Sequence, residues 1–313
     1  MRVFFAAGEN AQRYWAPEFR DVLVSFASSV VRKRPPQKSW FLDSGAYSFF
    51  TAGTDGNVML DAYIAFLLGP AAGQETYASM DVIGDSKGTW ANDQKMRRAG
   101  LNPVAAVHHG EDHTLIQKYI DEGVRYIALG GYANAIRPRE AMRWIGACFT
   151  HVRTHLEKTG ELIKIHGFGM MDEAILLSFP FYSVDSTVWL ISQRYGKIVI
   201  WDAQKVTLAQ INPKSESHFL WAHERFGLPV ALIDGALVDD ARNLKAAWNI
   251  AEILDLSEFV TDIWTKRGIV WPDAAQTQVS LDAERQFLLE TYPEAVGMKK
   301  PWKRPEPWKA VAP

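Results

Sequence analysis

The most constraining feature of the sequence is a regular alternation of short apolar runs with segments of helical periodicity. Each run ends in a polar or glycine-rich turn, and a helical pattern then leads to the next run. Such alternation is typical of βαβ units and of a parallel sheet. The runs lie at Val3–Ala6, Trp40–Leu42, Tyr77–Met80, Val104–Val107, Tyr126–Leu129, Leu162–Ile165 and Phe181–Val184.

The number of these units favours a barrel. Seven units exceed what a small doubly wound fold needs, so we predict an α/β fold of the (β/α)8 TIM type. Two later runs, Lys197–Trp201 and Pro229–Ile233, both qualify as the eighth strand. If the later run closes the barrel, residues 188–225 form an insertion after the seventh strand. The barrel then spans residues 1–256, and residues 257–313 form a helical extension with a basic tail rich in proline and tryptophan.

Composition excludes several classes of protein. The 313 residues are 48% hydrophobic and 22% charged, which is ordinary for a soluble globular protein and excludes intrinsic disorder. No run of 18 apolar residues occurs, so we expect neither a membrane span nor a membrane partner. The apolar start is too short for a signal peptide, so we expect a cytoplasmic protein. The formal net charge of −2 does not indicate a nucleic-acid binder, although a local basic surface would suffice for one.

The chain has one cysteine, Cys148. A single thiol forms no internal disulfide, and a zinc site rich in cysteine is excluded. Cys148 lies in a helical pattern and is expected to be a small core residue. We expect neither a cofactor nor a metal.

The residues that follow the predicted strands carry the chemistry. In a parallel barrel the loops after the strands converge at one end, where functional side chains gather. A carboxylate at the end of an apolar strand is costly unless it is paired or functional. Three carboxylates, several histidines and two glycine-rich turns therefore predict a site on this rim. They occur in Asp43-Ser44-Gly45-Ala46-Tyr47, Asp81, His108-His109-Gly110, Gly130-Gly131-Tyr132, His166-Gly167-Phe168-Gly169 and Asp185-Ser186.

Two other interpretations compete for parts of this set. His108, His109 and the segment 111–113 offer metal-ligating side chains, but no HExxH spacing is present and neighbours diverge at a strand end. Capping of the next helix by Asp112 and its neighbours is the simpler interpretation. Gly167-Phe168-Gly169 is only a GxG, and it lacks the Lys-Ser/Thr of a phosphate loop. These glycines favour close approach of a flat ligand to the backbone.

Taken together and in order, these segments resemble the tRNA-guanine transglycosylase superfamily. The resemblance runs from about Trp40 to Lys197, and each motif alone is weak. Asp43–Tyr47 looks like the family's DSGG(F/Y) motif, and Asp81 falls on its base-reading aspartate. The remaining matches are Val107-His108-His109-Gly110 to VQGG, Ala128-Leu129-Gly130-Gly131-Tyr132 to (A/I)GGL, His166-Gly167-Phe168-Gly169 to MGVG, Met171-Asp172-Glu173 to PED, and Val184-Asp185-Ser186 to the segment of the nucleophilic aspartate.

The departures from the family point to one of its branches. The tRNA enzymes hold a structural zinc with three cysteines and one histidine after the nucleophile strand, whereas Cys148 lies before that strand. The chain is also shorter. These losses resemble the phage and bacterial branch that inserts 7-deazaguanines into DNA. His108 replaces a glutamine, and His166 replaces a base-stacking methionine.

The resemblance implies base exchange by double displacement through a covalent glycosyl-enzyme. Asp185 is then the nucleophile on C1′ of a deoxyguanosine, and Asp43 is the general acid and base. The implied partners are DNA, with its target guanine flipped or single-stranded, and a free 7-deazaguanine base such as preQ0. The implied base-binding residues are Asp81, His108, Leu129, Gly130, Gly131, Tyr47, Ser44, His166 and Gly167.

A nucleic-acid surface is expected beyond Asp185. Aromatic and cationic residues alternate there, which suits stacking and phosphate contact. An ordinary amphipathic insertion would show the same pattern. The residues concerned are Trp189, Gln193, Arg194 and Lys197.

Three alternatives remain open from the sequence. The same chemistry could act on tRNA. A metal-dependent barrel hydrolase could use His108, His109 and Asp81. A non-catalytic relative could bind nucleic acid without any reaction.

Overall fold

The computed structural model describes residues 1–6, 21–28, 39–53, 56–69, 76–131, 138–191, 195–212, 214–229, 232 and 238–296. Contacts within the chain divide it into two compact units. Unit 1 contains Met1–Val188 and Val260–Glu284, and unit 2 contains Trp189–Phe259 and Arg285–Pro313. Each unit is described by itself. The boundary at residue 256 stays a prediction.

Unit 1 is built on an eight-stranded sheet whose strands are all parallel. Their order across the sheet is β4-β3-β2-β1-β8-β7-β6-β5, so strands consecutive in the chain are neighbours in this order except for β4 and β5, which stand at its two ends. The strands are β1 (Arg2–Ala6), β2 (Asp21–Ser25), β3 (Ser39–Asp43), β4 (Thr76–Tyr77), β5 (Ala105–His108), β6 (Tyr126–Gly130), β7 (Lys164–Gly167) and β8 (Ser183–Ser186).

The two end strands of this order also approach each other. A parallel bridge joins Ala78, just after β4, to Val104, just before β5. Two backbone hydrogen bonds support it, from Ser79 N to Val104 O at 2.8 Å and from Val104 N to Tyr77 O at 2.8 Å. The sheet is therefore curled, and its strand order and helical flanks are compatible with a TIM-type barrel.

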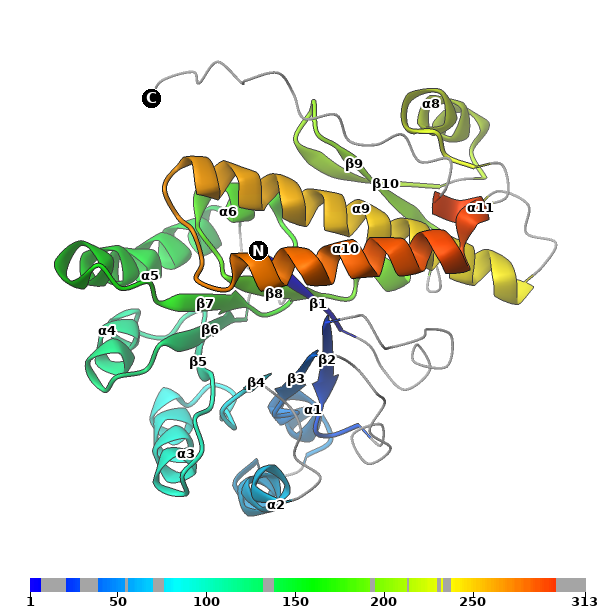
Figure 1. Ribbon diagram of the computed structural model, residues 1–313. Helices are drawn as coiled ribbons and strands as arrows, with labels where there is room; N and C mark the ends of the chain where they lie inside the picture. The colour runs from blue at the N-terminus through cyan, green and yellow to red at the C-terminus, as the bar shows by residue number, and fades with distance from the viewer. Residues whose placement is uncertain are drawn as a thin grey trace. The chain divides into compact units, whose positions relative to one another are not determined.

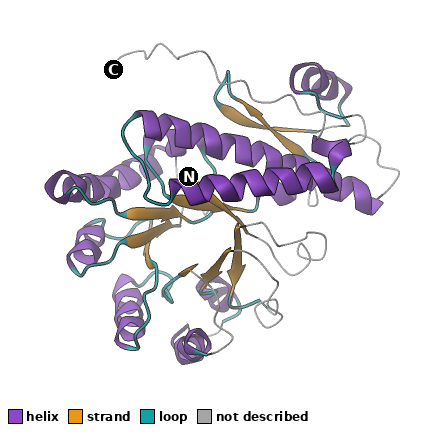
Figure 2. Ribbon diagram, in the orientation of Figure 1, coloured by secondary structure: helices purple, strands orange, loops and turns teal. Residues whose placement is uncertain are grey.

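Helices connect most of the strands and lie outside the sheet (Figure 2). In Figure 1 helices α3, α4 and α5 follow one another, from cyan to green, outside strands β4 to β7. The helices are α1 (Ala46–Thr51), α2 (Gly56–Leu68), α3 (Ser86–Arg98), α4 (Thr114–Asp121), α5 (Pro138–Thr159) and α6 (Glu173–Ser178). No helix in the described part of the chain is long and apolar enough to cross a membrane.

All seven apolar runs predicted as strands overlap a strand of this sheet, but the eighth strand was assigned wrongly. The missing strand is β2, whose sequence Asp-Val-Leu-Val-Ser alternates in burial instead of forming the continuous apolar run expected of a parallel strand. Lys197–Trp201 overlaps β9 (Ile198–Asp202), which pairs with β10 (Thr207–Ile211) in a separate antiparallel sheet. Pro229–Ile233 lies mostly outside the described residues.

This correction moves the predicted insertion. The strand that carries Asp185 is the eighth of the sheet and pairs directly with β1, for example through Val3 and Val184. Residues 188–225 therefore follow the eighth strand rather than separate the seventh from the eighth. An apolar run marks a buried strand, but it does not specify which neighbour the strand will pair with.

The interior of the sheet is apolar and aromatic. A buried cluster contains Phe4, Phe41, Ala78, Val104 and Ala128, with the rings of Phe4 and Phe41 edge to face at 5.3 Å. Burial of each phenylalanine side chain contributes about 1.5–3 kcal/mol. This cluster supports the side chains at the carboxyl ends of the strands.

The Val260–Glu284 segment of unit 1 covers the opposite, amino end of the sheet. The amino group of Met1 donates to Thr261, and the hydroxyl of Tyr182, just before β8, donates to Asp273. Lys164, at the start of β7, lies 3.2 Å from the same carboxylate. These contacts place the Val260–Glu284 segment at the amino end of the sheet, opposite the carboxyl ends of the strands.

Unit 2 contains β9, β10 and helix α8 (Glu216–Phe226), together with parts of α9 (Val238–Lys266) and α10 (Ala274–Thr291) and helix α11 (Pro293–Val296). Two α9 side chains serve the backbone of β9. Asn249 Oδ1 accepts from Val199 N at 2.9 Å, and Glu252 Oε2 accepts from Trp201 N at 2.7 Å. These bonds satisfy N–H groups that would otherwise be buried without a partner.

Candidate functional site

A cavity of about 960 Å³ opens at the carboxyl ends of the strands of unit 1. Its walls come from β2 and from the turns after β3 to β8. Seven of the residues predicted from sequence line this one cavity: Asp43, Tyr47, Asp81, His108, Gly130, Gly131 and Asp185.

Asp185 is the last but one residue of β8 and is buried. Its Oδ1 atom accepts a hydrogen bond from Gly169 N at 2.8 Å and lies 3.3 Å from His166 Nε2. Gly169 adopts a φ of 61°, a conformation that favours glycine and that aims its N–H at this oxygen. Within the described part of the chain both hydrogen bonds reach Oδ1, so Oδ2 is the oxygen left for a ligand.

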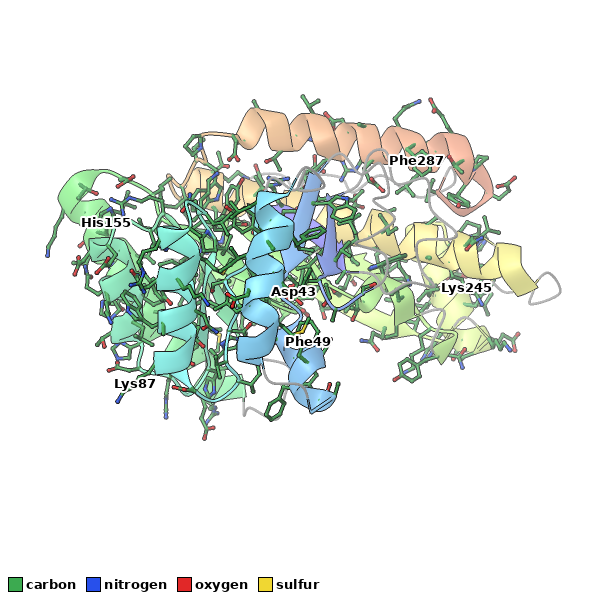
Figure 3. The ribbon with its side chains drawn as sticks, turned by 90° about the horizontal axis from the view of Figure 1, so that it is seen from below. Asp43, Phe49, Lys87, His155, Lys245 and Phe287 are labelled. Atoms are coloured by element: carbon green, nitrogen blue, oxygen red, sulfur yellow. The ribbon has the colours of Figure 1, made fainter. Side chains whose placement is uncertain are left out.

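Asp43, which is labelled in Figure 3, is the last residue of β3. Burial and the negative charges of Asp81 and Asp185 raise the pKa of Asp43 to about 7, although a hydrogen bond from Gly45 N at 3.0 Å opposes the shift. Asp43 therefore exchanges a proton near neutral pH. The electrostatic coupling also places Asp43 near both other carboxylates.

Gly45 is required for this arrangement. Its φ of 79° lies in the left-handed region, and a Cβ atom there would come within 2.9 Å of Ala27 N. The glycine thus lets the chain turn sharply after β3 and return its N–H to Asp43.

Asp81 is held by two side chains. Its Oδ1 accepts from the hydroxyl of Ser44 at 3.0 Å, and its Oδ2 lies 3.2 Å from His108 Nε2. Ser44 is fully buried, so it acts on a ligand only through Asp81. A carboxylate has about four lone-pair sites, and Asp81 therefore keeps acceptor capacity for a ligand in the cavity.

The glycine pair after β6 makes room for His108. A Cβ atom on Gly130 would lie 2.8 Å from His108 Cδ2. The backbone of His108 is fixed by Glu111, whose Oε2 accepts from His108 N at 2.8 Å. Gly131 adopts a φ of 79°. Both glycines are thus explained by geometry, and Gly130 lets the imidazole reach Asp81.

Four predicted site residues have no side chain at the cavity surface. Leu129 is buried, and its carbonyl accepts from Phe168 N at 2.9 Å. Gly167 packs so closely that a Cβ atom would lie 2.7 Å from Met170 Cβ. Ser44 and His166 are fully buried.

The expected stacking role of His166 is wrong. Its ring is 0% exposed and lies 4.5 Å from the Phe41 ring. β7 continues through Gly167, so His166 is a strand residue that points into the sheet interior instead of a turn residue after the strand. Phe168, which the sequence analysis did not single out, lines the cavity in its place.

The predicted nucleic-acid surface stays a prediction, because only Trp189 and Lys197 of its four residues lie in the described part of the chain. Trp189 is 2% exposed in unit 2, so its ring offers no stacking face, which corrects the prediction. The cause is the short helix Val188–Leu190, which turns its side chain inward. Gln193 and Arg194 lie outside the described residues. Lys197 is exposed in unit 2.

The residues weighed as a metal site have other roles. Glu111 holds the backbone of His108, and Asp112 Oδ1 accepts from Thr114 N at 2.9 Å at the start of α4. Among the described residues no three His, Cys, Asp or Glu side chains are arranged to hold a metal ion.

The cavity is strongly acidic. Asp43, Asp81, Glu111, Asp112 and Asp185 line it, and no lysine or arginine is among its described lining residues. Such a cavity favours a neutral or cationic ligand that donates several hydrogen bonds, and it disfavours a phosphate group.

Comparison with known proteins assigns no family. No protein-family model matches this chain, and neither does any curated protein. The likeness to the tRNA-guanine transglycosylase superfamily therefore stays a prediction, and the function has to be argued from the site.

Proposed function

We propose that this chain is a guanine transglycosylase that exchanges guanine in DNA for a 7-deazaguanine base such as preQ0. The observation that carries the proposal is the pair Asp43 and Asp185 at one cavity, each in a different environment. Asp185 Oδ1 accepts from Gly169 N and lies beside His166 Nε2, whereas the raised pKa of Asp43 lets Asp43 hold a proton near pH 7. Carboxyl groups separated in this way can divide the roles of nucleophile and acid.

The reaction is a double displacement. Asp185 Oδ2 attacks C1′ of the target nucleotide, and the C1′–N9 bond breaks as Asp43 gives its proton to the leaving guanine. The product is an ester between Asp185 and the sugar. The incoming base then gives its N9 proton to the Asp43 carboxylate and attacks C1′, which releases Asp185. Two displacements retain the configuration at C1′.

The other lining residues suit a guanine-like base. Asp81 can accept from the N1–H and 2-amino groups of the base, and His108 lies beside it. Tyr47 and Phe168 supply aromatic rings at the cavity wall. Stacking of a base on an aromatic ring contributes about 1–3 kcal/mol.

The acidic cavity limits how DNA can bind. The acidic lining disfavours phosphate, so the base and sugar enter while the neighbouring phosphates stay outside. The target guanine must therefore be flipped out of the duplex or lie in a single strand.

DNA is favoured over tRNA by the missing zinc ligands. Cys148 is buried on α5, and burial raises the pKa of its thiol to about 12. A thiol that stays protonated is neither a zinc ligand nor a nucleophile. The chain thus lacks the cysteine set that the tRNA enzymes use.

The proposal includes a closed (β/α)8 barrel. The bridge between Ala78 and Val104 joins the two end strands, which is where closure is needed. A closed barrel brings the turns after β3 and β8 to the same mouth, as the shared cavity requires.

Incorporation of label tests the function. Labelled guanine and labelled preQ0 are offered with single-stranded DNA, duplex DNA and tRNA to the wild type and to Asp185→Ala and Asp43→Ala. Asp112→Ala is the matched control, because Asp112 lines the cavity but its carboxylate accepts from Thr114 N at the start of α4. We expect label in DNA only, lost in both variants and kept in the control. Label in tRNA only would overturn the choice of DNA, and no label in any nucleic acid would overturn the proposal.

A further inference from the structure

A chain of buried polar side chains leads from inside the sheet to Asp185. His166 Nε2 lies 3.3 Å from Asp185 Oδ1, and His166 Nδ1 lies 2.8 Å from Ser183 Oγ. Ser183 Oγ in turn lies 2.5 Å from the hydroxyl of Tyr126. The chain thus crosses three neighbouring strands, β6, β7 and β8.

The register of the strands explains why these residues meet. His166 of β7 is the direct partner of Ser183 in β8. Ser183 and Asp185 are two residues apart on one strand, so their side chains point to the same face. That face is the sheet interior, where the ring of His166 is fully buried against Phe41 at 4.5 Å and Phe168 at 4.8 Å.

The direction of each hydrogen bond in this chain can be assigned. Burial lowers the pKa of His166, although Asp185 opposes the shift, so the imidazole is neutral near pH 7 and carries one N–H. The nucleophilic form of Asp185 is the carboxylate, which only accepts, so in that form the N–H is on Nε2 and points at Asp185. Nδ1 then accepts from the Ser183 hydroxyl. The only hydroxyl hydrogen of Ser183 is then donated to His166, so the Ser183 oxygen accepts from the Tyr126 hydroxyl.

We propose that His166, held in one tautomer by Ser183 and Tyr126, is a positioning residue that fixes Asp185 with Oδ1 bound and Oδ2 directed to the substrate. The inference rests on the proposed role of Asp185 as the nucleophile. His166 is fully buried and touches no substrate, so it acts only through Asp185.

The arrangement serves both displacements. Before attack, the N–H groups of His166 and Gly169 hold one carboxylate oxygen and prevent rotation of the side chain. After attack by Oδ2, Oδ1 is the carbonyl oxygen of the ester. When the incoming base breaks the ester bond, negative charge returns to the carboxylate, and the same two donors stabilise it. No proton leaves His166 in either step.

Variants of His166 separate its two hydrogen bonds. His166→Phe removes both, and we expect kcat to fall about 100-fold with KM changed little, as for loss of a donor to a developing charge. His166→Gln keeps an N–H in the place of Nε2, and we expect it to recover at least about tenfold of that loss. His166→Asn places its amide near Nδ1 and should behave like His166→Phe. A purely structural residue would not distinguish glutamine from asparagine in this way.

Variants further along the chain test the tautomer. Ser183→Ala and Tyr126→Phe should lower kcat about 2- to 10-fold, the range of one neutral hydrogen bond, with the larger effect for Ser183→Ala. Tyr119→Phe is the matched control for Tyr126→Phe, because Tyr119 is a buried tyrosine that packs on Trp90 of α3. Thermal unfolding identifies any variant that has lost its fold.

The deciding measurement is the nitrogen NMR spectrum of histidine-labelled protein at pH 7, with His166→Gln used to assign the signal. We expect His166 as the neutral tautomer protonated on Nε2, and a mixture of tautomers in Ser183→Ala. A charged ring, or a proton on Nδ1 in the wild type, would overturn the inference. This result does not depend on activity. If the spectrum is as expected but no base exchange occurs, the proposed function fails and the assigned hydrogen bonds stand; if exchange occurs and His166→Phe keeps its kcat, only this inference fails.

Discussion

The β7–β8 side of the cavity and its β3–β4 side each present an aspartate at the end of a strand, but the two carboxylates meet different neighbours. Asp185 receives N–H donors from Gly169 and lies beside His166, whereas Asp43 faces the negative charges of Asp81 and Asp185. The same residue type thus lies beside hydrogen-bond partners on one side of the cavity and beside negative charges on the other. Local donors and charges, rather than residue type, assign the two roles.

The largest effect is expected at the nucleophile. Asp185→Asn keeps the size of the side chain and removes its charge, so we expect base exchange to fall by about 10⁴-fold or more. Asp185→Glu moves the carboxylate by one methylene away from its two donors and should also be nearly inactive. Incorporation of labelled guanine measures both. Residual exchange within tenfold of the wild type would contradict the assignment of Asp185.

Replacement of Asp43 is expected to have the next largest effect. Asp43→Asn removes the acid, and we expect the first displacement to slow by about 10²- to 10⁴-fold. In the wild type this step needs protonated Asp43, so its rate should fall as the pH rises through about 7. Single-turnover release of guanine from pH 5.5 to 9 measures this limb, which Asp43→Asn should lack. The same limb in the variant would mean that another group supplies the proton.

Asp43→Asn should lower activity but raise the stability of the folded protein at high pH. Its pKa is raised to about 7 by folding, so folded protein binds the proton more tightly, and stability falls as the pH rises from about 4 to 7. Above pH 7 the folded state carries the cost of a buried charge. Asp43→Asn should therefore raise Tm at pH 8 by about 2–4 °C, or ~1 kcal/mol, and much less at pH 5. Calorimetry at the two pH values measures this, and equal shifts would contradict the raised pKa.

A smaller effect is expected at Gly130, where the lack of a side chain makes room for the His108 ring. In Gly130→Ala the new methyl group displaces the imidazole from Asp81, because the two would lie 2.8 Å apart. Loss of a hydrogen bond to a charged group should raise KM for the base about 10- to 100-fold. Gly146→Ala is the control, since a Cβ atom there would meet Phe179 at an ordinary 3.6 Å. An unchanged KM in Gly130→Ala would remove His108 from base binding.

The smallest effect is expected at the rim. Tyr47 is 58% exposed and lines the cavity, so Tyr47→Ala should raise KM about 5- to 20-fold by loss of stacking. Phe50→Ala is the control, because Phe50 is equally exposed on the same helix but does not line the cavity. Titration of each variant with the free base, followed by protein fluorescence, measures the affinity for the base in both variants. Equal effects would show that α1 contributes only general apolar surface.

The position of the site could be predicted from the sequence, because parallel strands bring their carboxyl ends together wherever their exact bounds lie. Asp43, Asp81, His108, Gly130 and Asp185 lie around one cavity for this reason. The expected roles of these residues came from the family resemblance, which remains a prediction.

The predictions that were wrong concern strand pairing and the direction of side chains. β2 alternates in burial and gives no apolar run, so its place in the sheet follows only from its pairing with β1 and β3. The sequence pattern ends the strand at Ile165 and places His166 in the turn. β7 instead continues to Gly167, so the His166 side chain points into the sheet interior beside Ser183. Phe168 lies between Gly167 and Gly169, and the glycine pattern gave no sign that the phenylalanine ring lines the cavity. A one-residue change in strand bounds exchanges the two faces, which residue type alone does not reveal.

The central claim is that Asp185 forms a covalent bond to the sugar. The direct measurement is mass spectrometry of the wild type after incubation with a guanine-containing single-stranded oligonucleotide, an acid quench and protease digestion, with Asp185→Asn as the control. We predict that the peptide that contains Asp185 carries the oligonucleotide less one guanine, joined through C1′ of its sugar, and that the variant carries no adduct. An adduct on the Asp43 peptide, or active base exchange without any adduct on Asp185, would contradict the account.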